Sequence, residues 1–134
     1  MKIDGHCHCG AIAYEAETDP DKASICHCTD CQTLSGSAFR TVIATREGSF
    51  RLLSGNPRIY VKTAESGAPR QQAFCPNCGT PIYSTSVGDA PKVHFIRLGT
   101  VRQRRELMPQ TQIWSRSAMP WLGQLGAIRA VEKQ

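Results

Sequence analysis

Apolar residues alternate with polar or small residues in two parts of the chain, at 12–17 and at 58–62. A period of two is typical of a half-buried β-strand, because successive side chains point to opposite faces of a sheet. Other segments are rich in β-branched or aromatic residues and are bounded by turn residues, which also favours strands. These further strands are expected at residues 38–45, 50–53, 71–74, 81–85 and 93–98.

Turn-forming residues separate the expected strands at short intervals. Glycine-containing turns are expected at residues 47–49, 54–57, 66–69 and 88–91. The intervals leave no room for the crossover helices that parallel strands require, so the sheets are expected to be antiparallel. One short helix is expected to start with Thr29 or Asp30 as its cap, to run toward Leu34 and to end at Gly36. The pattern therefore predicts a mainly β fold with one or two short helical turns.

The length and composition are those of one domain, residues 1–134. No Pro/Gly/Ser-rich linker divides the 134 residues, and the 40% of hydrophobic residues are enough for a modest core. A metal that ties distant segments together would compensate for this small size. No apolar stretch has the length of a signal peptide core or a membrane span, so a cytoplasmic location is expected.

The seven cysteines fall into three tight clusters, and their number divides into four plus three. In a reducing compartment such spacings favour metal binding over disulfides, and an odd number cannot pair completely. Two distant pairs can close a four-thiolate cage, whereas a group of three leaves one coordination position open. A closed cage is structural, and an open one can do chemistry. The two pairs are Cys7 with Cys9 and Cys75 with Cys78, and the group of three is Cys26, Cys28 and Cys31.

The two cysteine pairs predict a structural zinc site. Cys7 and Cys9 are expected to share one side of an extended strand, with His6 and His8 facing away. In the segment 75–79, proline suits a tight turn and glycine permits a left-handed backbone just after the second sulfur. The alternatives are unligated core cysteines or a histidine ligand from His6 or His8.

The group of three predicts an open metal site. Cys26 and Cys28 are expected to share a strand face, and the step through residues 29–30 folds Cys31 back toward them. The fourth ligand is then water, a substrate, or a side chain such as His27 or His94, although strand geometry turns His27 away. Two alternatives stay open: an iron–sulfur cluster held by three cysteines, and a second stabilising zinc closed by a histidine.

The net charge gives little support to nucleic-acid binding. The formal charge is +5. Zinc with four thiolates carries −2 and zinc with three carries −1, which together reduce this value to +2. The only dense basic cluster, at 102–105, adjoins Glu106 and favours a solvated surface turn. No nucleic-acid or membrane partner is expected.

Several stretches carry a resemblance that spans nearly the whole chain. They are residues 5–12, 26–31 followed by 36–39, 74–82, 113–114 and 120–122. With these stretches the chain resembles the glutathione-dependent formaldehyde-activating enzymes, a family that also contains centromere protein V. One departure is Gln112, where many relatives carry histidine. No family motif fixes glutathione-binding residues onto positions of this sequence.

The resemblance implies a fold, two cofactors and a reaction. The fold is a β-tent of two small antiparallel sheets stapled by zinc. The reaction is that of a carbon–sulfur lyase, which joins the thiol of glutathione to formaldehyde as S-hydroxymethylglutathione. A small thiol and a small aldehyde are thus the expected partners. The implied ligands are Cys7, Cys9, Cys75 and Cys78 for a structural zinc, and Cys26, Cys28 and Cys31 for a catalytic zinc.

The expected mechanism places the substrate sulfur at the open position of the catalytic zinc. Lowering a thiol pKa by about 3 units is nearly offset by the lower nucleophilicity of the thiolate, so acceleration requires positioning and donors to the developing alkoxide. Gly36 and Ser37 are the candidate donors. Trp114 and Trp121 either line the pocket or fill the core. Candidate partners for the carboxylates of glutathione are Arg40, Arg46, Lys62, Arg70 and Arg97.

Two other functions remain compatible with the sequence. The protein could capture thiols or aldehydes at the open zinc without accelerating their reaction. It could also be an interaction module in which both metals only build the fold, as the kinship with centromere protein V allows.

Overall fold

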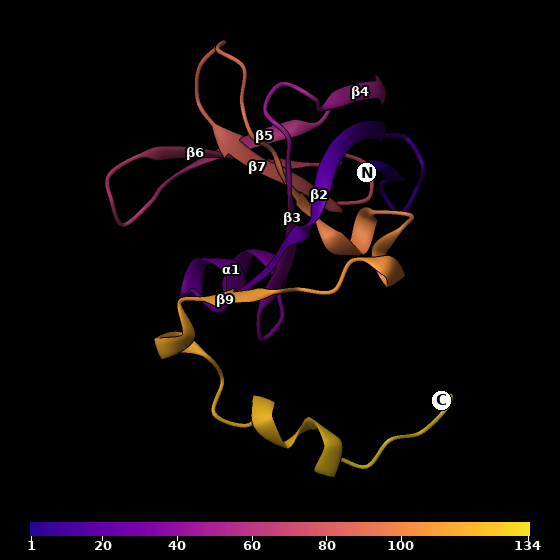
Figure 1. The fold of residues 1–134 in the computed structure, drawn as a ribbon, viewed down its shortest axis with the longest axis vertical. Helices are drawn as coiled ribbons and strands as arrows, with labels where there is room; N and C mark the ends of the chain where they lie inside the picture. Colours follow the sequence, from indigo (N-terminus) through magenta and orange to yellow (C-terminus); the bar gives the residue numbers. More distant parts are fainter.

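The computed structural model describes all residues, Met1–Gln134, and contains nine strands and one α-helix (Figure 1). The strands are β1 (Lys2–His6), β2 (Ala13–Cys26), β3 (Arg40–Thr45), β4 (Arg51–Ser54), β5 (Arg58–Thr63), β6 (Pro69–Phe74), β7 (Pro81–Ser86), β8 (Phe95–Arg97) and β9 (Thr111–Ile113). The helix is α1 (Thr29–Ser35), and four 3-10 helices follow: η1 (Leu98–Thr100), η2 (Arg104–Glu106), η3 (Ser115–Ser117) and η4 (Leu122–Ala127).

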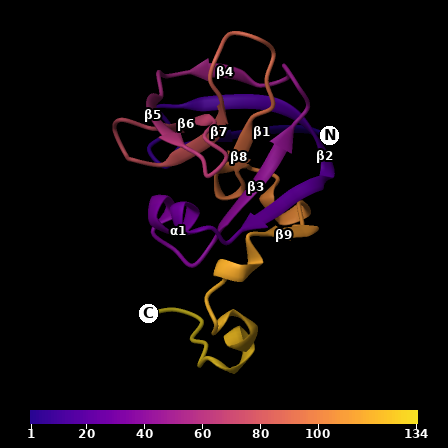
Figure 2. The same cartoon turned by 90° about the vertical axis from the view of Figure 1, so that its left-hand side faces the viewer.

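The long strand β2 organises the fold because it belongs to two sheets (Figure 2). Its first part pairs with β1 and β4, and its last part pairs with β3 and β9. The register of β2 with β3 shifts between Thr18 and Ala23, and Pro20 lies within this interval. Proline donates no ladder hydrogen bond, and an irregular register lets a strand bend. The two sheets are thereby joined into one hydrogen-bonded network.

The strand order is β1-β2-β3-β8-β7-β6-β5, and all neighbours along this path are antiparallel. The predicted mainly β, antiparallel fold is confirmed. The exception is β9, which lies parallel to β2. The sequence predicted neither β9 nor β1, and β2 extends well beyond the alternating segment at 12–17. The pairing of β9 with β2 connects residues far apart in sequence, so no local pattern predicts it.

Strand β5 forms where the alternation predicts it, but it is not half-buried. Ile59, Tyr60 and Val61 are 40%, 55% and 50% exposed, respectively, although their side chains point to opposite faces. The reason is that β5 is the last strand of the sheet and pairs only with β6. An edge strand lacks the covering that a central strand receives.

The helix α1 confirms its predicted end but not its predicted cap. Cys28, rather than Thr29 or Asp30, is the N-cap, and its side chain accepts a hydrogen bond from the Cys31 N–H. Gly36 ends the helix in the left-handed conformation, with φ of 65°, as expected. The four 3-10 helices exceed the one or two helical turns that were predicted. No helix of the protein has the length and apolarity that a membrane span requires.

The core lies against one face of the larger sheet. Ile43 of β3 and Ile96 of β8 are neighbours in the register and are completely buried. Tyr14 of β2 is buried as well, and its hydroxyl lies 2.7 Å from Thr100 Oγ1. Since side chains alternate along a strand, the residues next to Ile43 and Ile96 face the other side of the sheet. That second face carries the candidate site described below.

The C-terminal segment extends away from the sheets (Figures 1 and 2). It contains η4 and exposes Trp121, Leu125, Ile128 and Val131. Trp121 therefore fills no core and does not line the cavity of the candidate site. This part of its sequence-based interpretation is wrong, because nothing folds back against the segment.

Candidate functional site

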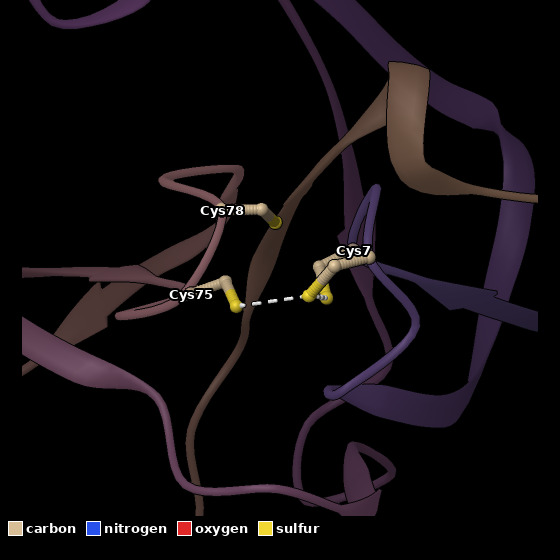
Figure 3. Close-up of side chains that lie close together, drawn as sticks. Cys7, Cys75 and Cys78 are labelled. Atoms are coloured by element: carbon tan, nitrogen blue, oxygen red, sulfur yellow. Dashed lines mark hydrogen bonds between the residues drawn. The ribbon is translucent and has the colours of Figure 1, made fainter.

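Four cysteines from two turns converge between the sheets. Cys7, Cys75 and Cys78 direct their side chains toward one another (Figure 3), and all four sulfur atoms of the group with Cys9 lie within 4.8 Å of one another. The Cys7 and Cys9 sulfurs are 3.6 Å apart, and the Cys9 and Cys75 sulfurs 3.8 Å. Four sulfurs at about 2.3 Å from a tetrahedral zinc lie about 3.8 Å apart. The four side chains therefore fit a tetrahedral metal ion.

Both halves of this cage are turns, which corrects the strand geometry expected for Cys7 and Cys9. The Gly10 N–H donates to the Cys7 carbonyl at 3.0 Å, and Gly10 has a φ of 81°. In the second half the Gly79 N–H donates to the Cys75 carbonyl at 2.8 Å. Gly79 has a φ of 76°, the left-handed conformation that the sequence predicted. A turn brings two sulfurs to one side as an extended strand would, so the grouping of the pairs holds although its reason was different.

Hydrogen bonds reach two of these sulfurs and favour the thiolate form at Cys78. The Ile12 N–H donates to Cys7 Sγ at 3.3 Å. Hydrogen bonds from the side chain and backbone of Thr80, and from the Cys9 backbone, lower the pKa of Cys78 to about 5. A thiolate is the form that binds metal. The four sulfurs form the group without His6, whose ring nitrogen instead lies 2.7 Å from the Cys7 carbonyl oxygen.

The other three cysteines meet where β2 ends and α1 begins. Cys26 is the last residue of β2, Cys28 caps the helix, and Cys31 lies in its first turn. Their three sulfurs lie within 4.8 Å of one another, and the Cys31 N–H donates to Cys28 Sγ at 3.3 Å. A hydrogen bond with Cys31 lowers the pKa of Cys26, and the same contact together with burial raises the pKa of Cys31. The trio could hold a metal ion with three thiolates.

A cavity of about 270 Å³ opens onto this trio. Its lining follows from strand register, because directly paired residues point to the same face of a sheet. The face opposite the core thus combines the end of β2 with polar positions of β3, β6, β7 and β8. The pairs on it are Cys26 with Arg40, Val42 with Arg97, and Ser84 with Gln72.

Two buried arginines stand in this cavity. Arg40 is 6% exposed and Arg97 is 8% exposed. Gln72 Oε1 accepts from Arg97 Nη2 at 2.6 Å and from Arg40 Nη1 at 3.4 Å, and Ser84 Oγ accepts from Arg97 Nη1 at 3.3 Å. Burial lowers the pKa of Arg97 to about 9, and the charge of Arg40 acts in the same direction. Sequence reasoning missed Gln72, because it is only one polar residue within a predicted strand.

Of the other cationic candidates, two line the cavity of the trio and one does not. Lys62 lines the cavity and donates to Asp30 Oδ2 at 2.7 Å. Arg70 lines it as well, with its guanidinium 5.3 Å from the centre of the Phe95 ring. Arg46 does not line it. Instead, Arg46 is exposed and binds the carboxylates of Asp19 and Glu17.

Neither proposed histidine lies among the sulfurs of the trio. His27 is buried, and its Nε2 lies 2.7 Å from Gln112 Oε1. His94 packs between Phe50 and Tyr83, with ring centres 4.4 and 4.8 Å away. Burial lowers the pKa of His94 to about 4. Neither of the two histidines that were possible fourth ligands therefore completes the trio, and the role of Gln112 as the partner of His27 was missed.

The His27–Gln112 contact yields a prediction on stability. It ties β9 to the residue that separates Cys26 from Cys28. We expect Gln112→Leu to destabilise the protein by about 1 kcal/mol, because it removes the partner of a buried ring nitrogen. Urea unfolding measures this change. Gln110→Leu is the control, since Gln110 is exposed and its side chain bonds only to the nearby Met108 carbonyl. Equal stability of the two variants would contradict the prediction.

The candidate oxyanion donors Gly36 and Ser37 serve another purpose. The Gly36 N–H donates to the Thr33 and Gln32 carbonyls, and the Ser37 N–H donates to the Gln32 carbonyl at 3.3 Å. Both residues are exposed, and neither lines the cavity of the trio. Both amides already donate hydrogen bonds to carbonyls at the end of α1, so the donor role expected for them is not supported.

Trp114 lies in the pocket wall, which is one of the two places that the sequence left open for it. It lines the cavity of the trio, and the Arg116 guanidinium lies 5.0 Å from the centre of its ring. It is also the only residue other than glycine with positive φ, at 55°. This conformation is uncommon for a bulky side chain and occurs often at binding sites. The backbone at the end of β9 is thus shaped to direct an aromatic ring at the cavity.

Two comparisons with known proteins concern the sequence and the fold of the chain. The family model described as glutathione-dependent formaldehyde-activating enzyme matches residues 2–117. A crystal structure of a Rhodobacter sphaeroides protein has a similar fold, with a TM-score of 0.61 and 19% sequence identity. The match covers 81% of this chain and 98% of that one. At this identity the structural likeness supports the fold alone, and the family match concerns the sequence.

Proposed function

Since the chain belongs to the family of glutathione-dependent formaldehyde-activating enzymes, we propose that it is a carbon–sulfur lyase acting on glutathione and formaldehyde. The product is S-hydroxymethylglutathione, and the reaction is reversible. The observation that carries this proposal is the cysteine trio, which opens into a cavity lined by positively charged side chains. Such a cavity suits a negatively charged thiol.

Zinc is the metal that suits both cysteine groups. Thiolate ligands favour zinc, and the sulfur spacing in the group of four matches a closed tetrahedral site. We assign a structural zinc to Cys7, Cys9, Cys75 and Cys78, and a catalytic zinc to Cys26, Cys28 and Cys31. When bound by the trio, zinc supplies positive charge that lowers the pKa of a thiol at its open position.

The reaction forms one bond and transfers one proton. The glutathione sulfur gives an electron pair to the formaldehyde carbon, the π pair of the carbonyl moves to oxygen, and that oxygen takes up the proton that the thiol lost. No electron is gained or lost overall. A thiol pKa lowered by about 3 units produces nearly complete ionisation but weakens the nucleophile roughly 16- to 30-fold. The rate gain must therefore come largely from orienting the two reactants.

The side chains of the cavity have two tasks in this reaction. Arg70 brings positive charge toward the aldehyde oxygen, on which negative charge develops. Trp114 forms an apolar wall that restricts water.

We further propose that residues 1–134 act as a single domain in the cytoplasm, where a reducing environment keeps all seven cysteines free.

Turnover above the spontaneous reaction tests the proposed function. Exchange between glutathione and its formaldehyde adduct is measured by NMR at equilibrium with increasing amounts of zinc-loaded protein. We expect an exchange rate that rises in proportion to protein concentration. A protein that only captures thiol would deplete free glutathione without increasing the exchange rate, and that result would contradict the enzymatic proposal.

A further inference from the structure

The face of the sheet next to the trio concentrates positive charge without matching acids. Arg40, Arg70 and Arg97 line the cavity, and none of them forms a salt bridge with a carboxylate. Lys62 is the exception among the cations, because Asp30 neutralises it. Arginines are seldom buried without an ionic partner, since the loss of hydration is costly. Two buried arginines side by side therefore require an explanation.

The hydrogen bonds of these arginines leave several of their N–H donors without a partner. Gln72 offers a neutral oxygen to both Arg40 and Arg97, at the place where a carboxylate would normally neutralise them. The Nε of Arg97 is buried and has no partner. A guanidinium has five N–H donors, of which only two of Arg97 are used. Donors thus remain available to an acceptor that enters the cavity.

A charge count shows that the metal site alone does not balance these arginines. Three thiolates and a divalent ion contribute −1, and the three arginines contribute +3, so the cavity retains +2. A ligand with about two negative charges would neutralise it. Glutathione with an ionised thiol has this charge, because its two carboxylates and one thiolate exceed its single ammonium group by two.

The two buried arginines also stand where two cavities meet. Arg40, Gln72 and Arg97 line the cavity of the trio and a second cavity of about 310 Å³. Tyr60 and Phe74 line only the second one. A ligand longer than a simple thiol can therefore place its sulfur at the trio and pass the arginines with the rest of its chain.

We propose that Arg97 and Arg40, held together by Gln72, form an anion subsite that binds a carboxylate of the thiol substrate. The subsite selects small anionic thiols over neutral and cationic ones. This inference rests on the proposed function, because it takes the trio as the place of the substrate sulfur. The role is positioning and specificity, since the arginines bind a part of the substrate remote from the reacting sulfur.

Thiol binding to cobalt-substituted protein tests the subsite apart from catalysis. The probes are glutathione and its diethyl ester, which keeps the thiol and loses both carboxylates. The dissociation constant is taken from the thiolate-to-cobalt absorption band. We expect the wild-type protein to bind glutathione about 10- to 100-fold more tightly than the ester, as charge-assisted hydrogen bonds in a buried site require. In Arg97→Gln this preference falls to less than about threefold, with the affinity for the ester unchanged.

Matched variants make the result specific. Arg46→Gln removes the same charge from an exposed arginine outside the cavity, and it should keep the wild-type preference. Arg97→Lys keeps the charge but loses the planar fork, and it should show a reduced preference. If Arg97→Gln fails to fold, Arg97→Lys and Arg40→Gln carry the same test. A preference that falls equally in Arg46→Gln would overturn the local subsite.

The cobalt experiment gives one result if only the subsite proposal fails and another if the proposed function fails as well. A cobalt band with equal affinity for glutathione and its ester would overturn the subsite, while thiol binding at the trio would stand. No band with either compound would overturn both. A band with glutathione alone, lost in Arg97→Gln, supports both.

Discussion

Cys78→Ser is expected to abolish cooperative folding, the largest effect of any substitution considered for this protein. Cys78 and Cys75 lie in the turn between β6 and β7, whereas Cys7 and Cys9 follow β1. A metal at this cage joins two turns that are 66 residues apart at the Cys9–Cys75 contact. Structural zinc contributes about 10–16 kcal/mol of apparent binding free energy, which equals or exceeds the roughly 5–15 kcal/mol stability of a domain. Without the fourth thiolate most of this contribution is lost.

Circular dichroism and metal analysis measure this outcome together. Wild-type protein should bind two equivalents of zinc and unfold in one thermal transition. Cys78→Ser should lose the transition and release zinc, and a strong chelator should have the same effect on the wild type. A Cys78→Ser protein with the wild-type melting temperature would show that the cage does not stabilise the fold.

Cys31→Ser is expected to abolish turnover and leave the fold intact. Cys31 lies in the first turn of α1 and faces the open cavity, so the loss of its sulfur removes one metal ligand without breaking a strand pairing. A closed cage at the other four cysteines continues to join the two turns. The rate of adduct exchange should fall about 100-fold or more, as for other groups that stabilise charge in an active site.

The matched control for this variant is Ser37→Ala. Ser37 follows the same helix, but it is exposed and does not line the cavity. We expect Ser37→Ala to keep the wild-type rate and both zinc ions, and Cys31→Ser to keep one zinc ion and a cooperative unfolding transition. Full activity of Cys31→Ser would remove the trio from the reaction. A large loss of activity in Ser37→Ala would restore the donor role that the helix geometry does not support.

Cys78→Ser and Cys31→Ser together distinguish the roles of the two cysteine groups. Both replace one sulfur by oxygen, so the chemical change is the same at both positions. Only the topology differs, because one group links distant turns and the other joins the end of a strand to the adjacent helix. A fold lost in one variant and an activity lost in the other would assign a structural and a functional role separately.

Some features of the site were predictable because they are local. The spacing of Cys26, Cys28 and Cys31 places three sulfurs within a few residues, and the structure brings these sulfurs together. Gly36 and Gly79 adopt the left-handed conformations that their neighbours indicated. The predicted cap of α1 was wrong, because a cysteine side chain is not an obvious competitor to Thr29 or Asp30 for the helix N–H groups.

Other features depend on pairings between distant strands. The roles of His27 and Gln112 arise only when β9 lies beside β2. The same holds for the arginines: the sequence offered five cationic candidates, and the register of β3, β6 and β8 brought Arg40, Arg70 and Arg97 to the cavity and left Arg46 outside. No short-range pattern distinguishes a buried arginine from an exposed one.

The sequence by itself determined the mainly β class, the division of the cysteines into four and three, and the likeness to a family. These properties depend on side-chain periodicity and on spacings of two or three residues, both of which are local features of the sequence. The tertiary structure alone decided which charges surround the trio, where His94 lies, and that Gln112 is the partner of His27. Those properties depend on strand register, and register is set by the burial of the whole sheet against the core.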